Sequence, residues 1–149
     1  MIDKSIAEVQ QEIIEEFELF EDWMDKYKHI IDNGKKLPEL SDDYKINDYK
    51  IKGCQSNVWL HPEMEGDKVA FSADSEAAIV KGLIALLIRV YSGRKPSEIL
   101  DNDPEFIEKI GMREHLSPTR SNGLHSMIRQ MKLYALAYQK GNEQPSKQS

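Results

Sequence analysis

The architecture of this 149-residue chain is built around one apolar stretch, Asp74-Ser75-Glu76-Ala77-Ala78-Ile79-Val80-Lys81-Gly82-Leu83-Ile84-Ala85-Leu86-Leu87-Ile88-Arg89-Val90-Tyr91. From Ala77 onward its charged residues are Lys81 and Arg89. A helix with so little polar surface is buried on most sides. We expect Asp74-Ser75 to cap this helix and the following Ser92-Gly93 to end it. The stretch therefore predicts a central core helix around which the other elements pack.

Short apolar and β-branched segments precede this helix. They are Tyr49-Lys50-Ile51, Val58-Trp59-Leu60-His61 and Val69-Ala70-Phe71, and they are separated by Gly53, Gly66 and Asp67. Such segments are typical of strands. We predict an α+β fold with a small three-stranded antiparallel sheet packed against helices, and we expect Trp59 and Phe71 in its core.

Helical patterns lie on both sides. Ser5-Ile6-Ala7-Glu8 has the form of a capping box and opens an amphipathic helix. A second helix is expected from about Glu21 to Asn33-Gly34, a shorter one from Asp103-Pro104, and a long one from Leu116-Ser117-Pro118 through Ala137. We predict one domain over residues 1–140 and a disordered polar tail over 141–149.

Composition narrows the class of protein. The chain is 40% hydrophobic and 31% charged, with a formal net charge of −6. The acidic balance argues against a nucleic-acid-binding protein, and the acidic residues near the N-terminus fit a solvated helix face. The longest apolar stretch, residues 77–90, is too short to span a bilayer, and no signal peptide precedes the charged start. We expect a cytoplasmic protein without membrane or nucleic-acid partners.

Cys54 is the only cysteine. A lone thiol forms no internal disulfide and cannot supply the several thiolates of a structural zinc or iron–sulfur site. It acts as a single nucleophile or carrier, or it is an inert buried residue, as free cysteines often are. Gly53 before it and Gln55 and Ser56 after it are typical of a loop between two strands, where a reactive group is both held and accessible.

Other side chains are candidates to assist the thiol. A cysteine thiol with a pKa of about 8.5 needs a cation or hydrogen-bond donors to become a thiolate at neutral pH. Arg120 lies in the first turn of the last helix, where a cation is unfavourable, and such a violation suggests function or an ion pair. His61 and His115 are possible bases, although isolated histidines are more often structural. No metal-ligand spacing, phosphate loop or lysine-bearing cofactor motif occurs, so we predict no bound metal or cofactor.

Three blocks of the sequence resemble the SufE family of sulfur-acceptor proteins. They are Gly53-Cys54-Gln55-Ser56-Asn57-Val58-Trp59-Leu60, the block from Ala73 to Leu86, and His115-Leu116-Ser117-Pro118-Thr119-Arg120-Ser121-Asn122-Gly123-Leu124. They occur in the family's order over about residues 23–137. The resemblance implies a fold shared with the scaffold IscU, with the thiol loop at one end of the sheet.

The resemblance also implies an activity. Cys54 would take persulfide sulfur from a SufS-type cysteine desulfurase, stimulate that enzyme, and deliver sulfur to a SufBCD-type scaffold for iron–sulfur cluster assembly. Pyridoxal phosphate would belong to the desulfurase, and the chain would be a partner protein, a monomer or weak homodimer, rather than a stand-alone enzyme. The resemblance assigns thiolate stabilisation or partner docking to Arg120, Asp74, Gln55 and Gly53. A redox or regulatory protein with an oxidisable thiol, and a structural adaptor with a buried one, stay as alternatives.

Overall fold

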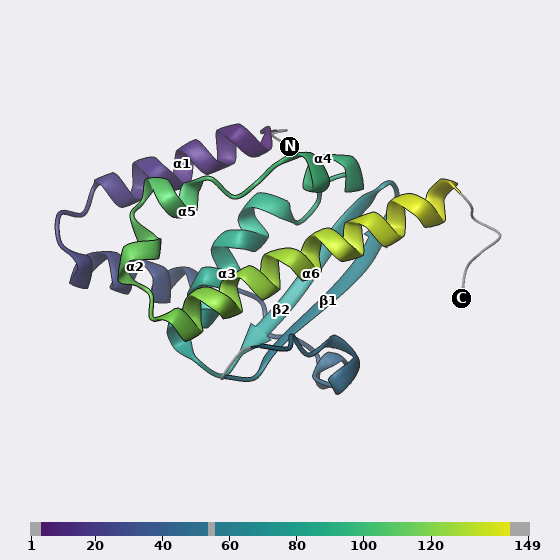
Figure 1. Cartoon of the computed structure of the whole chain (residues 1–149), viewed down its shortest axis with the longest axis horizontal. Coiled ribbons are helices and arrows are strands. Elements are labelled where there is room, and N and C mark those ends of the chain that lie inside the picture. The colour runs from purple at the N-terminus through teal and green to yellow at the C-terminus, as the bar shows by residue number, and fades with distance from the viewer. Residues whose placement is uncertain (1–3, 54–55, 144–149) are drawn as a thin grey trace.

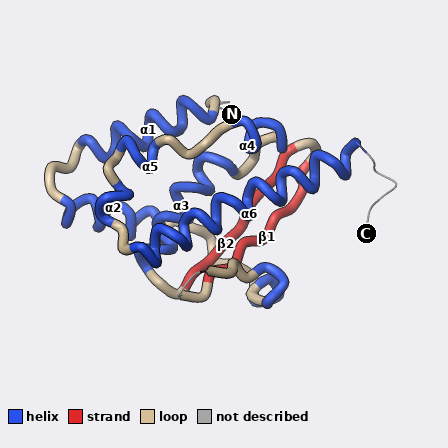
Figure 2. The backbone as a smooth tube through the Cα atoms, viewed as in Figure 1, coloured by secondary structure: helices blue, strands red, loops and turns tan. Residues whose placement is uncertain are grey.

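The computed structural model describes residues 4–53 and 56–143. In chain order its elements are α1 Ile6–Glu18, α2 Trp23–Lys35, the short 3-10 helices η1 Asp42–Tyr44 and η2 Asn47–Tyr49, β1 Val58–Glu65, β2 Lys68–Ser75, α3 Ala78–Tyr91, α4 Pro96–Asp101, α5 Phe106–Lys109, the 3-10 helix η3 Met112–His115, and α6 Pro118–Glu143. The α-helices gather on one side of one antiparallel hairpin, and α3 and α6 contact its strands (Figures 1 and 2). The α+β class is confirmed.

The helix α3 is the core element that its composition predicted. It contacts α1, α2, α6 and β2. Its residues 82–87, with Val90 and Tyr91, are buried. The Tyr91 hydroxyl, at the buried end, donates to the Asn102 carbonyl at 2.7 Å. Burying each leucine or isoleucine side chain here stabilises the fold by roughly 1.5–3 kcal/mol.

The start of α3 differs from the prediction. Asp74 and Ser75 are the last residues of β2, and the residue before the helix is Ala77, which makes no side-chain capping bond. Ser75 lies opposite Val58 in the antiparallel register. The expected Asp74 cap is therefore wrong, because strand pairing continues through the polar pair that the sequence pattern assigned to the helix.

The sheet has two strands in the described parts of the chain, not three. Its register runs from Val58 opposite Ser75 to Glu65 opposite Lys68. The segment 49–51 makes one isolated bridge, between Lys50 and Trp59, and its first residue closes η2. Only Lys50 and Ile51 of this segment follow the 3-10 turn, and two residues are too few to continue a ladder, so the predicted first strand is wrong.

Strand alternation separates the two aromatic residues expected in the core. Phe71 is 5% exposed and belongs to the core. Trp59 is only half-buried, because its neighbours Val58 and Leu60 point into the core and residue 59 points to the opposite face. The expectation holds for Phe71 and is wrong for Trp59.

Several helix ends agree with the sequence. The Ser5–Glu8 capping box is present, and Ser117 accepts a hydrogen bond from the Arg120 N–H at the start of α6. The helix α4 is an element that we did not predict, and α5 begins two residues after Pro104. The helix α6 continues to Glu143, so residues 141–143 of the expected tail are helical, and residues 144–149 lie outside the described residues.

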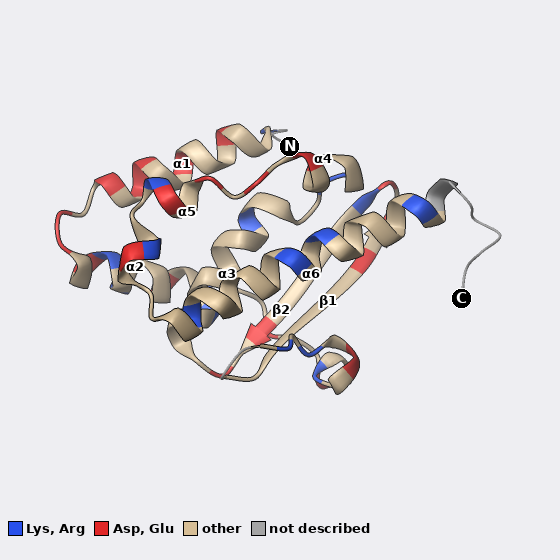
Figure 3. Cartoon of the chain, viewed as in Figure 1, with Lys and Arg blue, Asp and Glu red and all other residues tan. Residues whose placement is uncertain are grey.

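The charge is divided unevenly over the fold. Acidic residues gather on α1 and on its connection to α2, whereas α6 carries lysine and arginine along its length (Figure 3). One acid of α1, Glu16, is not simply solvated, because the Arg89 guanidinium donates to both of its oxygens at 3.0 and 2.6 Å. Within residues 4–53 and 56–143, no helix is both long and apolar enough to cross a membrane.

Candidate functional site

The loop that carries the lone cysteine is closed by a backbone hydrogen bond at its base. The Ile51 N–H donates to the Val58 carbonyl at 2.8 Å, and both residues are buried. Cys54 and Gln55 themselves lie outside the described residues. The loop of residues 52–57 therefore begins and ends at a fixed point of the core, at the open end of the hairpin.

Gly53 connects this loop to α6. It has a φ of +90°, and a Cβ atom built on it would lie 3.0 Å from Ser126 Oγ. Side chains other than glycine rarely adopt this backbone conformation. The structure therefore gives Gly53 a backbone role, namely close approach of the loop to α6.

The other half of the loop is tied to the start of α3. Asn57 Nδ2 donates to Glu76 Oε1 at 2.9 Å, and the Glu76 N–H donates back to the Asn57 carbonyl at 3.3 Å. Neither residue was singled out from the sequence. The only available signal was that both lie in the blocks that resemble the SufE family.

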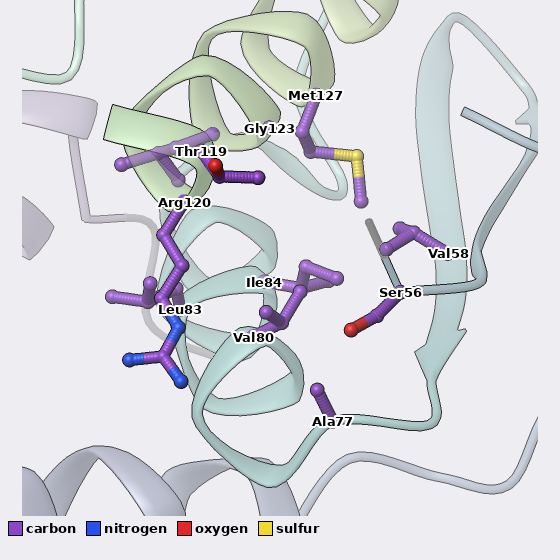
Figure 4. Close-up of a pocket in the computed structure, with 11 residues that line it drawn as sticks. Ser56, Val58, Ala77, Val80, Leu83, Ile84, Thr119, Arg120, Gly123 and Met127 are labelled. Atoms are coloured by element: carbon purple, nitrogen blue, oxygen red, sulfur yellow. The ribbon is translucent and has the colours of Figure 1, made fainter. Parts of the chain in front are cut away.

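A pocket of about 110 Å³ opens beside the loop. Its walls come from three elements that are distant in sequence: Ser56 and Val58 after the thiol, the residues Ala77, Val80, Leu83 and Ile84 at the start of α3, and the residues Thr119, Arg120, Gly123, Leu124 and Met127 in the first turns of α6 (Figure 4). Most of these side chains are apolar. The pocket is therefore a largely apolar hollow beside Ser56, two residues after Cys54.

Arg120 is the cation of this pocket. Its side chain extends from α6 past Leu83, on the opposite side of the pocket from Ser56 (Figure 4). It makes no ion pair with any described residue, and it is exposed. The sequence flagged Arg120 because it lies in the first turn of a helix, and the structure brings it to the space beside the thiol loop.

Asp74 lies opposite Trp59 in the hairpin and does not line the pocket. Its carboxylate accepts the Ser75 N–H at 2.8 Å and pairs with Lys81 Nζ at 3.2 Å and Lys45 Nζ at 3.3 Å. Burial alone would raise the pKa of Asp74, but these three donors together hold it below its usual range. Asp74 thus links the segment before the loop to α3.

The two candidate histidines lie away from the pocket. His61 is 9% exposed and stacks on Tyr44, with ring centroids 3.6 Å apart, and burial lowers its pKa against the opposing effect of Glu63. His115 stacks on Trp23 at 3.7 Å. Both have structural partners, and neither is positioned as a base for a group in the pocket. In the described part of the chain, no cluster of three or more His, Cys, Asp or Glu side chains is suited to hold a metal ion.

The profile described as "SufE: Fe-S metabolism associated domain" matches residues 11–135, which is most of the chain and includes every residue of the pocket. The chain belongs to the SufE family. It is 42% identical over 126 residues to an uncharacterised SufE-like protein of Rhizobium etli, with 81% of this chain and 85% of that protein covered. It is 38% identical over 129 residues to an uncharacterised SufE-like protein of Synechocystis, with 87% and 81% covered.

A solved structure has a similar fold. The solution structure of a hypothetical protein from Thermus thermophilus has a TM-score of 0.72 and 21% identity, and the match covers 87% of this chain and 94% of that one. This likeness supports the fold alone. Membership of the SufE family, by contrast, confirms the resemblance drawn from the three sequence blocks and associates the chain with iron–sulfur metabolism.

Proposed function

We propose that this SufE-family chain is a sulfur acceptor whose carrier residue is Cys54. The Cys54 thiolate attacks the outer sulfur of a persulfide on the active-site cysteine of a SufS-type desulfurase. The new S–S bond forms to Cys54 while the bond between the two desulfurase sulfurs breaks, and the electron pair leaves with the desulfurase thiolate. The products are Cys54 persulfide and a free desulfurase cysteine, so no external oxidant or reductant is required.

The observation that carries the proposal is that the chain's single cysteine lies in the family-matched part of the sequence, and that Ser56 and Val58, which follow it, line a pocket together with residues of α3 and α6. A carrier needs one thiol, whereas a cluster scaffold needs several. An apolar pocket suits this chemistry, because a persulfide that is kept from water and small thiols is not lost before delivery.

Arg120 is the residue that we propose for charge stabilisation. The transfer passes through an anionic array of sulfur atoms, and a guanidinium without a carboxylate partner among the described residues is available to stabilise it. Asp74, in contrast, is already engaged with two lysines, so we propose that it acts by positioning the segment before the loop.

Beyond the acceptance step, we propose that the chain stimulates its desulfurase by removing the persulfide, and that it delivers sulfur to a SufBCD-type scaffold in the cytoplasm. Pyridoxal phosphate belongs to the desulfurase in this scheme. The chain acts as a partner protein, as a monomer or weak homodimer.

Intact-mass analysis tests the acceptance step. The protein is incubated with a cysteine desulfurase and free cysteine and weighed before and after reductant. We expect a reductant-labile gain of about one sulfur atom, roughly 32 Da, because one thiol carries one sulfane sulfur. Cys54→Ser is the matched control, since it removes the sole cysteine and nearly preserves side-chain volume. An equal gain in the serine variant, or no gain with an active desulfurase, contradicts the proposal.

A further inference from the structure

A second hollow of about 470 Å³ lies between η2, the residues just before the thiol loop, and α6. We call it the basic groove. Its lining includes three cationic side chains, Lys50, Lys52 and Arg129, one carboxylate, Asp48, and two large side chains of α6, Leu133 and Tyr134. It shares no lining residue with the pocket, although α6 forms a wall of both.

The three cations of the basic groove outnumber its one carboxylate. Lys50, Lys52 and Arg129 are exposed, and none pairs with a carboxylate among the described residues. The neighbouring lysines 45 and 81 differ, because both pair with Asp74. In a chain with a net charge of −6, whose acidic residues gather on α1, the lining of this groove carries more cations than carboxylates. Like charges held together repel each other, so the groove favours an anionic occupant.

The groove also presents apolar surface. Leu133 is 46% exposed, and Tyr134 beside it is half-buried. An isolated inorganic anion would satisfy the cations and leave this surface in water. A peptide segment that combines acidic side chains with an apolar one would use both, as rim charges and buried anchors do in protein interfaces.

We propose that the basic groove docks an acidic segment of the sulfur-donating desulfurase, next to the cysteine that carries its persulfide. This inference rests on the proposed acceptor function. Lys52 is two residues from Cys54 in the chain, so a segment bound here is held beside the thiol. The donor has to bring its persulfide to that point. The reacting sulfurs of the two proteins are both negative and repel each other, so cations that attract the surface of the donor speed its association with this chain.

The test compares two donors on one double variant, Lys52→Glu with Arg129→Glu. The control variant, Lys28→Glu with Lys68→Glu, makes the same charge change at exposed lysines on α2 and at the far end of the hairpin. Loading of Cys54 is followed by intact mass, once from the desulfurase with cysteine and once from a small persulfide whose alkyl group carries no charge. Thermal melting checks that both variants are folded.

We expect the groove variant to load from the desulfurase about tenfold more slowly than the control at low salt, because reversing rim charges acts mainly on the association rate. The difference should shrink as salt is raised to about 0.5 M, where screening is strong. Loading from the small persulfide should be equal in the two variants.

Two outcomes overturn the inference. Equal desulfurase loading in the groove and control variants removes the docking role. Equal slowing with both donors means that the cations act on the thiol itself and not on a partner. Both outcomes differ from failure of the proposed function, in which the unmodified chain gains no sulfur from the desulfurase at all.

Discussion

Replacing Gly53 by alanine tests whether the thiol loop depends on its close approach to α6. Two costs add at this position. An alanine at a φ of +90° costs about 1–2 kcal/mol of folding free energy. Its Cβ would also meet Ser126 Oγ at 3.0 Å, and moving that hydroxyl from its preferred rotamer costs about 0.5–1 kcal/mol. Reduced freedom of the unfolded chain offsets about 0.4–1 kcal/mol. We expect Gly53→Ala to lower the free energy of unfolding by about 1–2 kcal/mol.

Two companion variants separate these costs. Gly66 also has a positive φ, of +66°, but a Cβ there would meet no atom within 4 Å. Gly66→Ala should therefore show only the backbone cost, about half of the loss at Gly53. Ser126→Ala combined with Gly53→Ala removes the contacting oxygen and should restore about 0.5–1 kcal/mol relative to the single variants.

Urea denaturation followed by tryptophan fluorescence measures these differences, and the intact-mass assay gives sulfur loading for the same proteins. Two results would contradict the close approach of the loop to α6. Gly53→Ala would be as stable as the unmodified protein, or adding Ser126→Ala to it would restore no stability. A loss of stability at Gly53 that leaves the loading rate unchanged would show that the loop's position is not limiting for sulfur transfer.

Three other variants give separate tests. Gly82→Ala should lower the free energy of unfolding by about 2–3 kcal/mol, because a Cβ there would lie 2.1 Å from the Ile30 carbonyl oxygen and force α2 from α3; a gain of about 1 kcal/mol, the helix-propensity effect alone, would contradict this. Asp74→Asn should cost about 1–2 kcal/mol near pH 7. The pKa of Asp74 is lowered in the folded state, so the ionised carboxylate stabilises the fold above its ordinary pKa of about 3.9. This contribution is lost as pH falls through the lower folded value. The free energies of unfolding of the two proteins should therefore converge in acid and not in base. Arg120→Gln should slow loading of Cys54 about tenfold, with Arg120→Lys intermediate, if the guanidinium stabilises the sulfur array; identical loading by all three proteins would remove Arg120 from the mechanism.

Periodic patterns predicted the parts of this fold that local chemistry controls. The helices α1, α2, α3 and α6 were anticipated from apolar spacing and from capping residues such as Ser5 and Ser117, which make the expected bonds. Asn33-Gly34 illustrates the limit. The pair correctly marked the end of α2, which lies one residue later at Lys35, but Gly34 has a second role, because a Cβ there would come within 2.8 Å of the Gly82 backbone nitrogen. The glycine serves contact between two helices, and no single stretch of sequence contains that information.

The candidate site shows the same division. Arg120 was singled out because a cation in the first turn of a helix violates a local rule, and that violation has an explanation only when the loop, α3 and α6 are brought together. Ser126, Asn57 and Glu76 obey every local rule and were missed. Asp74 was assigned to a helix cap because Asp-Ser before an apolar run is typical of one, and pairing with the other strand overrode that preference.

The helix α6 faces two different surfaces in successive turns. Arg120, Gly123 and Met127 line the pocket beside the thiol loop, while Ser126 and Arg129 line the basic groove. Because α6 forms a wall of both hollows, a shift of the helix caused by a ligand in the groove would also change the width of the pocket. The two sites would then be linked thermodynamically, and the coupling would be reciprocal. If a segment bound in the groove favours filling of the pocket, occupation of the pocket would strengthen binding of the donor segment in the groove by the same factor.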